Sequence, residues 1–174
     1  MGLGALGATA GPLLDGLHTW SGATFYGAPQ LLKSVWWCPP LFAAAALSIG
    51  LGRLVTERLL KVPLEDPGAR KAALSMLAFV LAYVASAWLP VSEPVKAALL
   101  LLAAGVVFVR LDFTRSAALG AVSAALGGWV VEHTLVHERL FFHRDTMLDG
   151  VALWIPPLYC LAAFAIGHVA RGLA

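Results

Sequence analysis

Three side chains with the capacity for metal or acid–base chemistry lie close together in the sequence: Glu132, His133 and His137. The two histidines are four residues apart and share a helix face, a spacing that metal ligands use. In zinc proteases a glutamate directly follows the first histidine, whereas this chain has Thr134 there. Membrane di-iron enzymes need several histidine boxes, and the whole chain has 5 His. We therefore predict no metal and no cofactor, and keep a lipid-modifying metalloenzyme using these residues as an alternative.

A second polar pair, Asp15 and His18, lies near the end of the first apolar segment. The predicted topology places this pair at the membrane depth of Glu132 and His133. Ionisable side chains inside a membrane are candidates for function. Two roles remain open: contact with the headgroup of a bound lipid, or pairing among these side chains that holds the first and fifth helices together. A proton relay would need further charges in mid-membrane, so a small transporter is a weaker alternative.

A very tight turn between two apolar segments contains Asp112, Thr114, Arg115 and Ser116. One interpretation is structural, with Asp112 or Thr114 accepting backbone N–H groups as the cap of the next helix. The other is functional, with Asp112 presented to a partner protein. The sequence leaves both interpretations open.

The amino-acid composition indicates which class of protein holds these candidate residues in place. The chain is 60% hydrophobic and 13% charged with a mean hydropathy of +0.81, whereas soluble domains are about 25% charged. These values exclude a soluble globular domain and indicate an integral membrane protein. The net charge of +2 is too small for a nucleic-acid-binding surface. Cys38 and Cys160 are too far apart for a CxxC redox pair and are expected to be buried.

The pattern of apolar stretches predicts an all-α fold, a single domain over residues 1–174 with six transmembrane helices and short loops. The longest connection, about residues 53–71, is predicted to be a solvated loop. Basic residues favour one side of the membrane, with 8 on the side of this loop and 4 on the other. The positive-inside rule then places both termini in the cytoplasm. The charge-free stretches that define the helices are 1–14, 34–52, 72–92, 97–109, 116–131 and 150–170. The fourth of them is short, so Lys96 and Arg110 are expected to reach the membrane surface from its ends.

An internal repeat relates two of these helices. Residues 37–50 and 154–167 are identical at eight of fourteen positions, including a Trp-x-Pro-Pro-Leu start. Proline is well tolerated in the first turn of a helix, where the N–H groups have no intrahelical partner. The repeat therefore predicts two helices with similar starts that run in the same direction.

Several motifs together resemble the Insig (insulin-induced gene) family. Residues 34–40, SVWWCPP, are similar to the family's SAWWVPP. Phe-Val at 79–80 followed by Ala-Ser-Ala at 85–87 matches a pair of motifs in the family's third helix. Residues 112–116, DFTRS, resemble the family's DRSRS. The resemblance extends over about residues 14–174, and the order and spacing of the motifs make it specific.

The resemblance implies a six-helix regulator without catalytic activity. Insig proteins bind a sterol within the membrane and hold partner membrane proteins that carry sterol-sensing domains. Asp112 falls on the family's partner-binding aspartate, with Arg115 and Ser116 in the same motif, and Phe79 falls on an aromatic residue implicated in sterol contact. The chain departs from the family at Phe113, where the family has Arg.

We therefore predict an Insig-like protein that holds a neutral lipid and engages a partner membrane protein. The ligand-binding residues expected from the sequence are Phe79, Tyr83, Trp129, His133 and His18. The chain has no Asn and twice as many Arg as Lys, which is typical of a GC-rich bacterial genome. A bacterial protein would reside in the plasma membrane and a eukaryotic one in the endoplasmic reticulum. The lipid is a sterol or, without sterols, a diacylglycerol-like lipid. Faces rich in small residues are compatible with a homo-oligomer.

Overall fold

The computed structural model describes residues 2–30, 33–63 and 65–174, and it confirms the all-α class. Two three-residue strands, β1 (Thr24–Tyr26) and β2 (Phe141–His143), pair antiparallel, with Phe25 opposite Phe142. The helices are α1 (Gly2–Ser21), α2 (Cys38–Leu59), α3 (Ala69–Trp88), α4 (Glu93–Leu111), α5 (Arg115–His137) and α6 (Ile155–Gly172).

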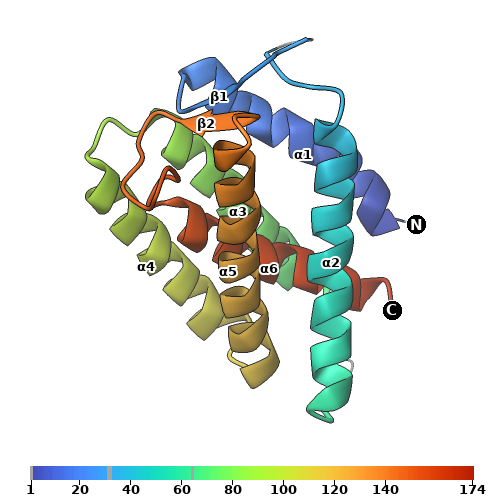
Figure 1. Ribbon diagram of the computed structural model, residues 1–174. Coiled ribbons are helices and arrows are strands. Elements are labelled where there is room, and N and C mark those ends of the chain that lie inside the picture. The colour runs from blue at the N-terminus through green and yellow to red at the C-terminus, as the bar shows by residue number, and fades with distance from the viewer. Residues whose placement is uncertain (1, 31–32, 64) are drawn as a thin grey trace.

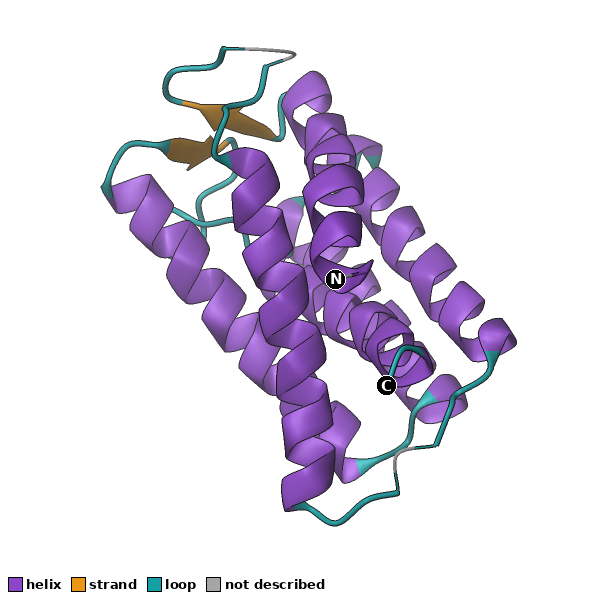
Figure 2. Cartoon of the chain, turned by 90° about the vertical axis from the view of Figure 1, so that its right-hand side faces the viewer, coloured by secondary structure: helices purple, strands orange, loops and turns teal. Residues whose placement is uncertain are grey.

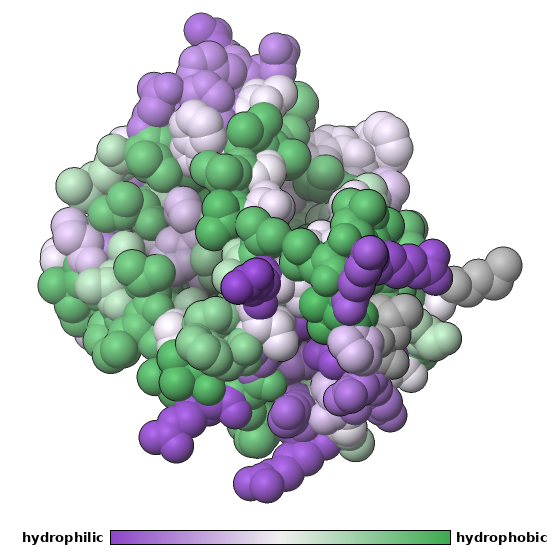
Figure 3. Space-filling model, turned by 90° about the horizontal axis from the view of Figure 1, so that it is seen from below, coloured by the Kyte–Doolittle hydropathy of each residue, from purple (hydrophilic) through white to green (hydrophobic). Residues whose placement is uncertain are grey.

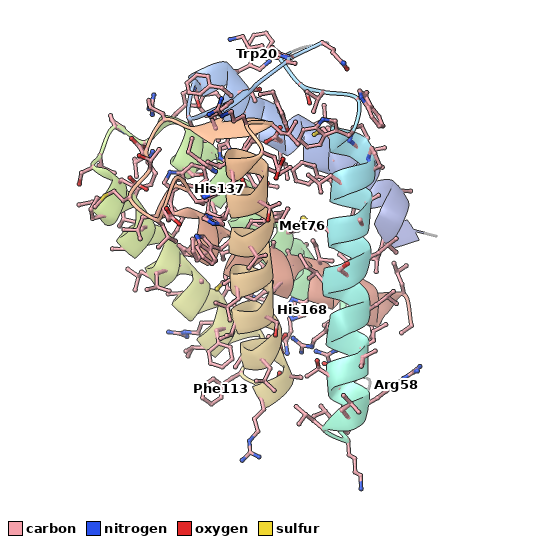
Figure 4. The ribbon with its side chains drawn as sticks, in the orientation of Figure 1. Trp20, Arg58, Met76, Phe113, His137 and His168 are labelled. Atoms are coloured by element: carbon pink, nitrogen blue, oxygen red, sulfur yellow. The ribbon has the colours of Figure 1, made fainter. Side chains whose placement is uncertain are left out.

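The helices form one bundle whose two ends differ (Figures 1 and 2). The strand end carries β1 and β2, and the opposite end, here the Asp112 end, carries the α2–α3 and α4–α5 connections. α2 and α5 lie side by side and run antiparallel, while α6 crosses behind them as the most buried helix (Figure 1). In Figure 4, Trp20 and His137 lie toward the strand end, whereas Arg58 and Phe113 lie at the Asp112 end.

The repeat detected in the sequence is visible in the backbone. Trp37 and Trp154 cap α2 and α6, with nearly equal dihedral angles of φ −84°, ψ −6° and φ −79°, ψ −7°. Each tryptophan precedes a helix with proline in its first turn. Because proline has a fixed φ and lacks an N–H group, it starts both helices at matching positions without an unsatisfied donor.

Four helices, α2 to α5, are long and apolar enough to span a membrane, and their outward faces carry large apolar side chains. Leu101, Leu102 and Leu126 are among these exposed residues. The view from the Asp112 end shows a largely hydrophobic surface from which hydrophilic side chains project in separate groups (Figure 3). Such a surface is stable in lipid and not in water, so the chain is an integral membrane protein.

Two local predictions are wrong. Residues 53–59 do not belong to a solvated loop, because α2 continues to Leu59 with Arg53 and Glu57 buried. These two side chains form an ion pair four residues apart, which makes their burial in the helix tolerable. Lys96, which we expected to reach the membrane surface, is also buried and donates from Nζ to the backbone oxygen of Ser86 at 2.9 Å.

Candidate functional site

A cavity with a volume of about 420 Å³ lies between α2 and α5. Its walls are rich in small residues, including Ala44, Ala45, Ala124 and Gly127. Phe42 and Tyr159 also line the cavity, from α2 and α6 respectively. Small residues on facing helices leave space that larger side chains would fill. A volume of this size falls in the usual range of small-molecule sites, about 300–1,000 Å³.

Two carboxylates line this cavity toward the strand end: Asp15 of α1 and Glu132 of α5. The Tyr26 hydroxyl donates to Asp15 Oδ2 at 2.8 Å. Glu132 accepts from the Tyr159 hydroxyl at 3.2 Å and lies 3.2 Å from His143 Nε2. The strand pairing holds Tyr26 and His143 at this end. The carboxylates give this end of the cavity a region of hydrogen-bond acceptors.

The opposite part of the cavity reaches a buried ionic cluster through Arg53. The Arg53 guanidinium lies 2.7 Å from Glu57 Oε1, 2.8 Å from Asp112 Oδ2 and 3.0 Å from Asp112 Oδ1. His168 of α6 lies 3.3 Å from Asp112 through Nε2 and 2.8 Å from the Ser75 hydroxyl through Nδ1. The cluster thus joins α2, α3, α6 and the α4–α5 turn at the Asp112 end. Figure 4 shows His168 in the interior, behind the space between α2 and α5.

The surroundings of Asp112 favour its charged form. Burial opposes ionisation, but the hydrogen bonds of His168 and Arg53 and the positive charge of Arg53 outweigh that effect. Together they hold the pKa of the Asp112 carboxyl well below its usual range. Asp112 is therefore a carboxylate engaged in ion pairs across the neutral pH range.

The predicted partner-binding residues lie in two different environments. Asp112 is 4% exposed, and Ser116 is fully buried with its hydroxyl 3.5 Å from Glu57 Oε1. Arg115 is exposed, and so is Phe113 at the tip of the turn, at 73%. Thr114 provides the cap of α5 by accepting from the Ala117 N–H at 3.1 Å, as one interpretation of the turn predicted.

Of the predicted ligand-binding residues, Phe79 and Tyr83 line a cavity, but it is the smaller one, of about 80 Å³ between α1, α2, α3 and α6. Their rings are 5.2 Å apart in an edge-to-face arrangement. His18 is buried, stacks on Tyr83 at 4.8 Å and bonds the Ser86 hydroxyl at 2.8 Å. Asp15 and His18 do not form the alternative pairing with α5, because Asp15 accepts from Tyr26 and His18 bonds Ser86.

Trp129, His133 and His137 form a separate stack on α5 that does not belong to the lining of either cavity. The Trp129 and His133 rings are 5.0 Å apart, and those of His133 and His137 are 4.1 Å apart. Trp129 donates to the backbone oxygen of Leu148, and His133 Nδ1 lies 3.6 Å from Asp149 Oδ2. Across residues 2–30, 33–63 and 65–174, no group of three His, Cys, Asp or Glu side chains is arranged to hold a metal ion.

Tyr26, Arg53 and Tyr159 are site residues that were not predicted from the sequence. Arg53 carried a usable signal, since an arginine four residues before a glutamate at the end of an apolar helix forms an intrahelical ion pair. The two tyrosines carried no such signal in the sequence. Their role depends on the fold, which brings Tyr26 of β1 to Asp15 and Tyr159 of α6 to Glu132.

The fold and the buried polar groups define the class of this protein: an all-α integral membrane protein with a cavity between its helices.

No family model matches the sequence, and no curated protein matches it. Two crystal structures of MvINS, the Insig homologue of Mycobacterium vanbaalenii, are similar, each with a TM-score of 0.85. The sequence identities are 27% and 28%, and the matches cover 97% of this chain and 90% of each MvINS chain. The chain is an Insig-like membrane protein, as its sequence motifs predicted. One of the MvINS structures is a cross-linked trimer.

Proposed function

We propose that this protein binds a neutral lipid in the large cavity and that lipid binding regulates a partner membrane protein. The proposal covers the whole chain as one domain, with α1 and α6 spanning the membrane together with α2 to α5 and both termini in the cytoplasm. The protein then acts by recognition and not by catalysis. An interface between copies of the chain is compatible with this function, and the trimer of MvINS supports it.

The observation that carries the proposal is the combination of apolar walls and a carboxylate end in one cavity. A hydroxyl group donates to Asp15 or Glu132, both of which line the cavity. A phosphate group would instead meet two acidic side chains there. The site therefore favours a headgroup that is uncharged and carries a hydroxyl, as in a diacylglycerol or a sterol. Exposed glycines in the lining, Gly52 and Gly127, support access of the lipid from the side of α2 and α5.

Filling the cavity tests the proposal. A Cβ atom added at Gly127 meets nothing within 4 Å, so Gly127→Phe places a ring in the cavity region without a clash at its base. Gly105 on α4 is also helical, exposed and free of neighbours within 4 Å, but it lies outside the cavity lining. Gly105→Phe is therefore the matched control for the cost of replacing a helical glycine.

The assay is retention of dioleoylglycerol by purified protein in detergent, measured as lipid per protein after gel filtration. We expect wild type and Gly105→Phe to retain the lipid and Gly127→Phe to lose it. Equal retention by the two variants would contradict binding between α2 and α5.

We also propose that a partner contacts the exposed part of the α4–α5 turn while Asp112 fixes that turn from inside. Phe113, Arg110 and Arg115 are exposed there, and Asp112 is held by Arg53 and His168. Loss of Asp112 then weakens partner association indirectly, through the position of the turn. Exchanging Phe113 and Arg115 for alanine should weaken the same association with little effect on thermal stability.

A further inference from the structure

Arg53 belongs to two sites at once. It lines the large cavity beside Gly52 and Thr56, and its guanidinium group holds Asp112 in the α4–α5 turn. The second carboxylate partner of the guanidinium is Glu57, one turn further along α2. Arg53 is thus a direct structural connection between the cavity and the surface turn.

The register of α2 against α5 places this connection next to the cavity. The Ser116 hydroxyl lies 3.5 Å from Glu57, so these two residues face each other across the antiparallel helices. One turn away on each helix, Gly120 and Arg53 are at corresponding positions. Both line the cavity, and a Cβ atom added to Gly120 meets nothing within 4 Å. Space for a ligand therefore extends along the helices to the level of Arg53.

The cluster also contains cations that remain beside the carboxylates when Arg53 moves. Arg171 Nε lies 3.5 Å from Glu57 Oε1, and Arg171 Nη1 lies 3.9 Å from Asp112 Oδ1. His168 lies 3.3 Å from Asp112 Oδ2. An isolated buried carboxylate is costly, but here two further positive or proton-donating groups accompany Asp112. If Arg53 turned toward the cavity, Asp112 would keep Arg171 and His168 as neighbours.

We propose that Arg53 couples occupancy of the cavity to the conformation of the α4–α5 turn. This inference rests on the proposed function, because it requires a ligand in the cavity. A ligand whose polar group or chain lies against Arg53 favours one guanidinium position over the other. Only such a difference in affinity shifts the equilibrium between the two arrangements. When the guanidinium changes partners, Asp112 and the cap of α5 follow, and the surface presented around Phe113 changes.

The coupling is measured by amide hydrogen exchange in residues 112–118, whose backbone bonds form the turn and the start of α5. The protein is purified in detergent, with and without dioleoylglycerol, and lipid retention is determined on the same samples. In the wild type, we expect bound dioleoylglycerol to change the exchange of this segment. Arg53→Lys keeps the charge but not the fork that spans two carboxylates. Compared with the wild type at equal amounts of bound dioleoylglycerol, it should lose the response.

A second variant, Gly120→Phe, tests the coupling even if Arg53→Lys does not fold. Gly120→Phe occupies the cavity beside Arg53, and we expect it to alter exchange in residues 112–118 without added lipid. Gly105→Phe, outside the cavity lining, should leave that segment unchanged.

Two results overturn the coupling while leaving lipid binding intact: a wild type that retains dioleoylglycerol with unchanged exchange, or an Arg53→Lys variant that responds like the wild type. If Arg53→Lys does not fold, unchanged exchange in Gly120→Phe overturns the coupling. A wild type that retains no dioleoylglycerol instead contradicts the proposed function for a diacylglycerol ligand, so the two failures are distinguishable.

Discussion

Replacing Asp112 by alanine removes the carboxylate that joins two helices in the buried cluster. The variant leaves the Arg53 guanidinium with Glu57 as its remaining carboxylate and removes the partner of His168 Nε2. Removing one partner of a buried ion pair costs about 3–5 kcal/mol. Glu57 stays 2.7 Å from Arg53 and compensates part of its charge, so we expect the low end of this range, about 3 kcal/mol.

The expected effect on thermal stability follows from that figure. For a chain of this size each kcal/mol lowers the unfolding midpoint by about 2–4 °C, which gives a decrease of about 6–12 °C for Asp112→Ala. The control is Thr114→Ala, which removes the cap of α5 in the same turn. A lost cap costs about 1 kcal/mol, and its midpoint should fall by about 2–4 °C.

Both midpoints are measured by intrinsic tryptophan fluorescence of purified protein in detergent during heating. Asp112→Ala should remain folded at room temperature but melt well below Thr114→Ala. If Asp112→Ala melts at the same temperature as Thr114→Ala or above it, the ionic cluster does not stabilise this end of the bundle. The assignment of Asp112 as an internal support of the turn would then be wrong.

Three further predictions concern the carboxylate end, the histidine stack and the topology. Glu132→Gln removes a charged acceptor from the cavity and should weaken dioleoylglycerol retention about tenfold, because a hydrogen bond to a charged group contributes about 1.5–3 kcal/mol; unchanged retention would exclude Glu132 from headgroup contact. A His133→Ala/His137→Ala variant should match the wild type in zinc and iron content after purification, and stoichiometric metal that only the wild type carries would favour the metalloenzyme alternative. A reporter fused to the C-terminus should give a cytoplasmic signal, and a signal from the other side of the membrane would reject the topology.

The helices were predictable because their signals are local. Charge-free apolar stretches marked all six, and the Trp-x-Pro-Pro repeat located two helix starts whose backbone angles agree closely. The end of α2 was missed because Arg53 and Glu57 look like loop residues when each is counted as an isolated charge. Paired with each other and with Asp112, they are stable inside the bundle.

The site was harder to predict because it depends on contacts between distant segments. Asp15 was recognised as a candidate from its depth in the membrane and Glu132 from its place beside His133, but their partners Tyr26 and Tyr159 were not. Trp129 and His133 seemed suited to a cavity from residue type alone. The face of α5 that carries Gly127 and Gly128 lines the cavity, and the side chains of Trp129 and His133 lie outside that lining. A helix face can be assigned only once the neighbouring helix is known.

The lipid content of the purified wild-type protein tests the central claim most directly. Lipids extracted from the protein are identified by mass spectrometry and compared with those of the membrane from which it was purified. We predict strong enrichment of one class of uncharged, hydroxyl-bearing lipid, a diacylglycerol or a sterol, and loss of that enrichment in Gly127→Phe but not in Gly105→Phe. A lipid profile that matches the surrounding membrane, or enrichment of an anionic phospholipid, would contradict the proposed neutral-lipid site.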